Sequence, residues 1–228
     1  MIVCDEFAVL HLHKSGGSFV NRLMLTCLPS ARRIGYHLPY SQIPDDARAL
    51  PVVGTVRNPW AYYVSWYHFQ RAQARPNALF LTCSEAGALG FADTIRNLIG
   101  LQNDSRRVDR LVAAFPADFQ QSGLNLTKAC IAPILGSGLG FYSFLYERLF
   151  AGAAQPRILM AEHLRDDLGA FLGATRAQSN DRTRAYLAAN PRVNASRHGP
   201  YQDYYDQDLR ALVAILDDRV IAAHGYSF

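Results

Sequence analysis

The feature that most constrains the fold is a short apolar run that ends just before a pair of glycines. Residues 7–13 read FAVLHLH, Gly16 and Gly17 follow, and a helical pattern covers residues 18–27. An apolar run of this length is typical of a buried strand, and apolar residues at helical spacing indicate a helix. The segment therefore predicts a strand, a tight turn and a helix.

Two further strands are predicted, each followed by a helix. Residues 51–56 and 157–161 are short apolar runs, and helical patterns begin near Pro59 and at 164–173. Strands that alternate with helices predict an α/β protein in which a parallel sheet carries helices on its faces. A final amphipathic helix is expected over residues 206–224.

The length of 228 residues suits a single domain, which we expect to span 1–228. Between about 75 and 155 the pattern changes to helical stretches separated by polar turns. This segment is predicted to be a mostly helical insertion rather than a second domain. Half of the residues are hydrophobic, which is enough for a well-buried core.

Charge and cysteine content exclude several functional classes. The formal net charge is only +4, too low for the dense basic patches of a nucleic-acid-binding protein. The four cysteines show no CxxC spacing, so we expect free thiols in a reducing compartment and no metal site. No signal peptide and no apolar run of roughly 20 residues is visible, which predicts a cytoplasmic protein without a transmembrane segment.

The turn after the first strand has the composition of an anion-binding loop. Residues 13–19 read HKSGGSF, at the point where the strand leads into the helix. Glycines allow several backbone N–H groups to converge on an anion, and the helix N-terminus adds a favourable dipole. Ser15 and Ser18 add hydroxyl donors, and Lys14 adds a mobile ammonium group. The loop is predicted to cradle a phosphate or a sulfate.

This loop is not the usual nucleoside-triphosphate loop, in which the lysine follows the last glycine and a hydroxyl holds magnesium. Here Lys14 precedes Gly16 and Gly17. The alternative that the turn is only a connector between strand and helix stays open.

A second group of residues follows the second strand. Arg57 stands at the end of residues 51–56, and Ser65 lies two helical turns into the next predicted helix. A forked guanidinium and a hydroxyl placed in this way can bind one phosphate. Taken alone, Arg57 is equally well explained as a surface charge, and Ser65 as a helix-packing residue.

Together the two motifs resemble the sulfotransferase superfamily. Residues 11–19, HLHKSGGSF, are similar to the family's 5′-phosphosulfate loop, usually written around PKTGGT. Residues 55–69, TVRNPWAYYVSWYHF, are similar to its 3′-phosphate segment, usually written around VRNPxxRxxSxY. The order and spacing of the motifs also match, and the resemblance is greatest to the carbohydrate sulfotransferases and their bacterial kin.

The resemblance implies a P-loop-like three-layer fold and transfer of a sulfuryl group from the nucleotide donor PAPS, which leaves as PAP. It implies that residues 14–19, Phe19 included, hold the 5′-phosphosulfate, that Arg57 and Ser65 hold the 3′-phosphate, and that Lys14 stabilises the leaving group without a metal. Residues 192–213 resemble a loop and helix of the bacterial sugar enzymes, so Arg197 is expected to close over the nucleotide. His13 stands where the family has proline, and residues 61–63 lack the family's arginine.

A general base is also needed, and His37 is the first candidate. Related carbohydrate enzymes place a histidine in a similar segment, and the ordinary pKa of histidine suits proton removal from a hydroxyl. A structural role for His37 is weighed equally. His11 and His13 are rivals that alternation places on one face of the strand. Glu162, after the third strand, is a weaker candidate, and His68 and His163 are interpreted as structural.

The acceptor is expected to be a small molecule, a sugar or a glycolipid that offers a hydroxyl or an amine. The aromatic residues of the insertion are candidates either for stacking on a sugar or for core packing, the commoner outcome; they are Phe80, Phe141, Tyr142, Phe144 and Tyr146. Two other functions stay open: a small-molecule kinase that uses the first loop for ATP, and a non-catalytic nucleotide-binding protein of the same fold.

Overall fold

The computed structural model describes residues 1–175, 181–189 and 198–228. The chain divides into two compact units, each built from separate stretches of sequence. The first unit contains residues 1–57, 120–125 and 148–195, and the second contains 58–119, 126–147 and 196–228. The expectation of a single domain stays a prediction.

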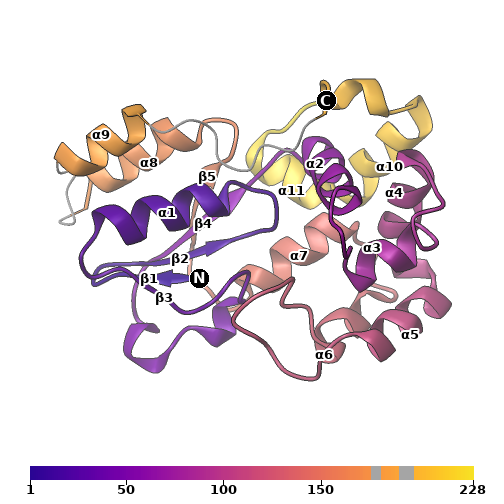
Figure 1. Cartoon of the computed structure of the whole chain (residues 1–228), viewed down its shortest axis with the longest axis horizontal. Helices are drawn as coiled ribbons and strands as arrows, with labels where there is room; N and C mark the ends of the chain where they lie inside the picture. Colours follow the sequence, from indigo (N-terminus) through magenta and orange to yellow (C-terminus); the bar gives the residue numbers. More distant parts are fainter. Residues whose placement is uncertain (176–180, 190–197) are drawn as a thin grey trace. The chain divides into compact units, whose positions relative to one another are not determined.

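A five-stranded mixed sheet forms the centre of the first unit (Figure 1). Its strands are β1 (Ile2–Val3), β2 (Ala8–His11), β3 (Arg32–Arg33), β4 (Val52–Val56) and β5 (Arg157–Met160), in the order β3-β1-β2-β4-β5. The strands β2, β4 and β5 are parallel neighbours, with Leu10 opposite Gly54 and Gly54 opposite Ile158. The three predicted strands are therefore confirmed, and they lie side by side.

The expectation of a fully parallel sheet is wrong at one side. β1 pairs antiparallel with β2 and also with β3. Both of these strands have only two residues, too few to produce a periodic apolar pattern that a sequence can reveal. A bend after β1, closed by a hydrogen bond from the Cys4 N–H to the Phe7 carbonyl (2.9 Å), returns the chain directly into β2.

Three helices belong to the first unit: α1 (Gly17–Cys27), α8 (Leu164–Gly173) and α9 (Asp181–Ala189). Apolar residues of α1 and α8 form one core cluster with strand residues such as Val9, Val53 and Leu159. On β4 the next residue, Gly54, faces Phe150, because a Cβ at Gly54 would lie 2.3 Å from the Phe150 ring. Alternation along the strand thus directs Val53 to the helices and Gly54 to the opposite side.

The second unit is helical among its described residues. It contains α2 (Pro59–Arg71), α3 (Ala78–Cys83), α4 (Phe91–Ile99), α5 (Ser105–Ala114), α6 (Lys128–Ile131), most of α7 (Phe141–Phe150), α10 (Gln207–Leu216) and α11 (Asp218–His224). The predicted helical character of the segment 75–155 is confirmed by α3 to α7. The helix α2 begins as expected at proline, and the Asn58 side chain caps it by accepting hydrogen bonds from the Trp60 and Ala61 N–H groups (3.0 and 3.3 Å).

The expected C-terminal helix over 206–224 is wrong in one respect, because α10 and α11 are separated at Asp217. The Asp217 carboxylate is buried and accepts hydrogen bonds from the Tyr63 hydroxyl (2.6 Å) and the Ser143 N–H (2.7 Å). Ser143 lies in the first turn of α7, whose N–H groups lack partners within the helix. Asp217 therefore caps α7 from a distant part of the sequence, a tertiary contact that apolar periodicity does not reveal.

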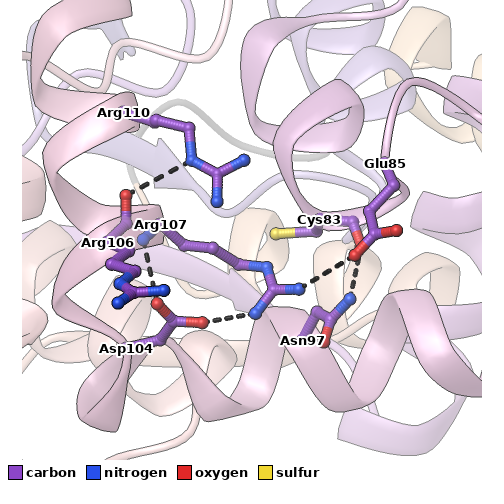
Figure 2. Close-up of polar contacts among 7 residues, drawn as sticks. All are labelled: Cys83, Glu85, Asn97, Asp104, Arg106, Arg107 and Arg110. Atoms are coloured by element: carbon purple, nitrogen blue, oxygen red, sulfur yellow. Dashed lines mark hydrogen bonds and ion pairs between the residues drawn. The ribbon is translucent and has the colours of Figure 1, made fainter.

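Figure 2 shows a polar cluster that connects α3, α4 and α5 in the second unit. Arg107 forms ion pairs with Asp104, the N-cap of α5, and with Glu85 (3.3 Å), in the turn after α3. Asn97 of α4 donates a hydrogen bond to the Cys83 carbonyl (2.9 Å). The cluster therefore connects the short helices α3, α4 and α5 near Cys83, at the buried end of α3.

Candidate functional site

The turn between β2 and α1 has an unusual backbone conformation. Lys14 and Gly16 both have positive φ values, 55° and 82°, and α1 begins at Gly17. Left-handed residues in alternation with right-handed ones turn successive N–H groups toward a common point, which is the geometry of an anion-binding nest. A left-handed conformation at a lysine is uncommon and concentrates at functional sites.

Each glycine of the pair is required for a different reason. Gly16 has a left-handed backbone, and a Cβ there would lie 2.3 Å from Leu164 Cδ2. A Cβ at Gly17 would lie 2.2 Å from His11 Nδ1, so the helix starts in direct contact with the histidine ring. Packing against β2 and α8 therefore demands both glycines and fixes the position of the loop.

Two cationic side chains meet at the carboxyl ends of neighbouring parallel strands. Arg57 follows β4 and donates a hydrogen bond from Nη1 to the Lys14 carbonyl (3.2 Å), in the loop that follows β2. Burial, with a further contribution from the Arg57 charge, lowers the pKa of Lys14 from 10.5 to about 8. Most Lys14 side chains are still charged at neutral pH, and the repulsion from Arg57 favours the binding of an anion here.

The other predicted loop residues lie in different environments. The Ser15 side chain is buried and donates a hydrogen bond to the His13 carbonyl (3.2 Å), which stabilises the turn. Ser18 is exposed in the first turn of α1. Phe19 packs in the core, with the Arg165 guanidinium 4.8 Å from its ring centre, and its N–H donates to the Gly16 carbonyl (2.9 Å). Phe19 therefore stabilises the loop by packing in the core.

Ser65 and Arg197, the remaining predicted donor-binding residues, are not part of the first unit's described structure. Ser65 is buried within α2 of the second unit. Arg197 lies outside the described residues. Their roles in binding a nucleotide stay predictions.

His37 lies beside the loop and has a defined hydrogen bond. Its Nδ1 is 3.2 Å from the His11 carbonyl, and because a carbonyl only accepts, Nδ1 carries the proton. Its ring centre is 4.1 Å from that of His13, the residue before Lys14. Burial, with smaller effects from the charges of His13 and His11, lowers the pKa of His37 well below its ordinary value. The imidazole is therefore neutral at pH 7, with its lone pair on Nε2.

The rival histidines, one at the end of β2 and one in the turn after it, are enclosed. His11 and His13 both contact the His37 ring, which agrees with their predicted placement on one side of the strand. Both are buried, and burial lowers the pKa of His13 to about 4. The Nε2 of His13 donates to the Leu124 carbonyl (2.8 Å). As a whole residue His37 is half-buried, less so than His11 and His13, although its ring is enclosed enough for burial to lower its pKa.

Glu162 is exposed and follows β5, while His68 lies in α2 and His163 directly precedes α8. The aromatic residues considered for the acceptor are mostly core residues: Phe80, Phe141, Tyr142 and Phe144 are buried, and Tyr146 is half-buried. The structure thus favours core packing for four of them.

Sequence reasoning missed the segment 120–125, which lies in the first unit although it is far from the strands in sequence. It contacts both His13 and the chain next to His37. Gly123 and Asn125, with φ values of 89° and 51°, are the only sequence signal, since glycine and asparagine favour left-handed turns.

No protein-family model matches the chain, and no curated protein matches it by sequence. Among the described helices, none is long and apolar enough to cross a membrane. In the described ranges, no group of three or more His, Cys, Asp and Glu side chains is arranged to hold a metal ion.

Proposed function

We propose that this protein is a sulfotransferase that transfers a sulfuryl group from PAPS to a hydroxyl or amine of a small-molecule acceptor, such as a sugar or a glycolipid. In this proposal the sheet and its helices form a P-loop-like three-layer fold, with the donor at the carboxyl ends of β2 and β4. Ligands of parallel α/β sheets commonly bind at that edge.

The observation that carries the proposal is the pair of cations at this edge. Lys14 and Arg57 come from loops 43 residues apart in sequence, and the Arg57 guanidinium donates a hydrogen bond to the backbone carbonyl of Lys14. Two cationic side chains favour a bound anion, and the N-terminus of α1 adds a favourable dipole. A nucleotide with several anionic groups suits this combination better than a neutral ligand does.

The proposed chemistry asks the protein for positioning and for charge neutralisation. The acceptor oxygen attacks the sulfur in line, the bond from sulfur to the bridging oxygen breaks, and PAP leaves with that electron pair. Lys14 neutralises the charge that develops on the leaving phosphate, as in phosphoryl transfer. The acceptor proton passes to a base at the same time.

His37 is the proposed base, and its hydrogen bond assigns the reacting atom. Because Nδ1–H is directed at the His11 carbonyl, Nε2 is the nitrogen that accepts the proton. The lowered pKa keeps the ring unprotonated at pH 7, and it also makes Nε2 a weaker base than that of an ordinary histidine.

Isothermal titration with PAP tests the donor site. We expect wild-type protein to bind PAP without magnesium, and we expect Arg57→Ala and Lys14→Ala each to weaken binding at least about tenfold, the usual order for a lost charge-assisted contact. Two controls match these changes: Arg22→Ala, on the exposed side of α1, and Lys128→Ala, the other lysine of the chain. Both controls should bind PAP like wild type.

The opposite pattern would favour another function. Magnesium-dependent binding of ATP without binding of PAP would replace the sulfotransferase proposal with a kinase. Tight PAP binding in a protein that transfers no sulfuryl group to any of a panel of sugars, glycolipids and amines would favour a non-catalytic nucleotide-binding protein.

A further inference from the structure

The segment 120–125 forms a clamp on the chain that carries His37. The Tyr36 N–H donates to the Gln121 carbonyl (3.1 Å), and the Asn125 side-chain amide donates to the Tyr36 carbonyl. The Leu124 carbonyl accepts a hydrogen bond from His13 (2.8 Å). One short segment therefore binds both the N–H and the carbonyl of Tyr36, the residue before His37. The same segment binds the ring of His13, which contacts the ring of His37.

Asn125 is the residue on which this clamp depends. It is only 8% exposed and has a left-handed backbone with φ 51°. Its Oδ1 accepts a hydrogen bond from the Gln120 N–H (2.8 Å) while Nδ2 donates to Tyr36. The Asn125 side-chain amide thus forms one hydrogen bond within the segment and another to the chain that carries His37. Asparagine suits both tasks, because it offers a donor and an acceptor and tolerates a left-handed backbone.

We propose that Asn125 is a positioning residue for the general base His37. This inference rests on the proposed function, since it assigns a task in the same reaction. His37 has a left-handed backbone of φ 53°, a conformation that persists only where the surroundings enforce it. The clamp supplies that constraint: it fixes the peptide before His37 and so aims Nδ1 at the His11 carbonyl and Nε2 at the acceptor.

Burial is the main influence on the titration of His37. The His13 and His11 rings and the Met1 amino group face it and add smaller effects in the same direction, and the uncharged Tyr36 ring lies next to it. If the clamp is lost, the His37 chain can relax from its left-handed backbone and Nδ1 can leave the His11 carbonyl. A ring that moves away from these groups and into water titrates at a higher pH.

The experiment compares Asn125→Asp with wild type. Aspartate keeps the size and the acceptor for Gln120, but it places an oxygen against the Tyr36 carbonyl and so removes the donor. The exposed Ser122→Ala, in the same segment, is the matched control. A second variant, Asn125→Gly, removes both hydrogen bonds yet tolerates the left-handed backbone.

The first readout is the ¹⁵N NMR spectrum of the His37 ring across pH, which does not depend on any ligand. We expect wild type and Ser122→Ala to show a proton fixed on Nδ1. Both Asn125 variants should lose that signature, and their His37 should titrate at a higher pH. With PAPS and an accepted substrate, kcat should fall about tenfold to a hundredfold, the order expected for a misplaced catalytic group, while PAP affinity stays close to wild type.

Three outcomes would overturn the inference. The first is a His37 spectrum in Asn125→Asp that is identical to that of wild type. The second is unchanged kcat despite an altered spectrum. The third is loss of folding in both Asn125 variants, measured by circular dichroism, which would assign Asn125 to stability. Failure of the proposed function is distinguishable, because it appears as absent PAP binding in wild type while the NMR readout still reports on the clamp.

Discussion

At the scale of single residues, the pairing of Lys14 with Arg57 is the most informative feature. The fold lowers the pKa of the Lys14 ammonium group to about 8 by burying it next to a second cation. Such an arrangement does not help folding, because the charged form of Lys14 is less favourable in the folded protein than in the unfolded chain. We propose that the arrangement serves anion binding instead.

A pH dependence of PAP binding follows from that shifted pKa. Bound anions favour the protonated lysine, so affinity should be highest well below pH 8 and should fall as the pH rises through about 8. Titrations from pH 7 to 9 avoid the phosphate's own ionisation near pH 6. Near pH 8, heats measured in buffers of different ionisation enthalpy should reveal proton uptake.

Lys14→Arg is the informative companion to that titration, because arginine stays charged over the whole range. Its PAP affinity should be independent of pH between 7 and 9, even if it is weaker than that of wild type. An equally flat profile in wild-type protein would show that Lys14 does not contact the anion.

At the scale of elements, the junction of α7, α10 and α11 shows how a buried polar group organises helices. Asp217 interrupts what would otherwise be one helix and caps the N-terminus of α7, together with the Tyr63 hydroxyl, which accepts from the Tyr142 N–H (3.1 Å). Burial raises the pKa of Asp217 to about 6, and the hydrogen bonds from Tyr63 and Ser143 act in the opposite direction. The Tyr63 hydroxyl connects the two ends of the network, since it donates to Asp217 and accepts from the Tyr142 N–H.

Removing the Tyr63 hydroxyl should therefore be costly. Tyr63→Phe leaves the buried Tyr142 N–H without its acceptor and removes one of the two donors to Asp217, so we expect unfolding to become easier by about 1–3 kcal/mol in urea titrations. The neighbouring Tyr62 is the matched control. Its buried hydroxyl has no hydrogen-bond partner among the described residues, so Tyr62→Phe should leave stability unchanged or raise it. Equal effects of the two variants would contradict this account of the network.

At the scale of the whole molecule, the buried histidines make stability depend on pH. Burial lowers the pKa of His13 from 6.5 to about 4, and His11 and His37 are shifted in the same direction. Below pH 6.5 these histidines bind protons in the unfolded chain but not in the folded protein. The free energy of unfolding therefore decreases as the pH falls from about 6.5 to about 4. Asp217 acts in the opposite sense in part of this range, since its pKa is raised.

Comparing variants isolates the contribution of one ring. His13→Gln keeps a donor for the Leu124 carbonyl but does not titrate. Its unfolding free energy should therefore depend less on pH than that of wild type, by on the order of 3 kcal/mol between pH 6.5 and 4. The exposed His163→Gln should show the wild-type dependence. Parallel curves for wild type and His13→Gln in urea titrations would refute the assignment.

The sequence by itself determined the elements whose signals are local. Three apolar runs predicted β2, β4 and β5, because buried strands are rich in apolar residues; β2 and β4 are buried at every position, and β5 is partly buried. The glycine pair after β2 predicted the turn, because only glycine permits both the left-handed backbone and the close approach of His11. The positions of Lys14 and Arg57 at strand ends followed from the same patterns.

Only the tertiary structure decided what depends on contacts between distant residues. It added two antiparallel strands of two residues each, divided the last helix at Asp217, and placed Ser15 and Phe19 in supporting roles rather than on the surface. It also brought the segment 120–125 to Tyr36 and left His37 less buried than the neighbouring His11 and His13. The hydrogen bond between Asn125 and Tyr36 joins residues about 90 positions apart, and no local sequence pattern reveals such a contact.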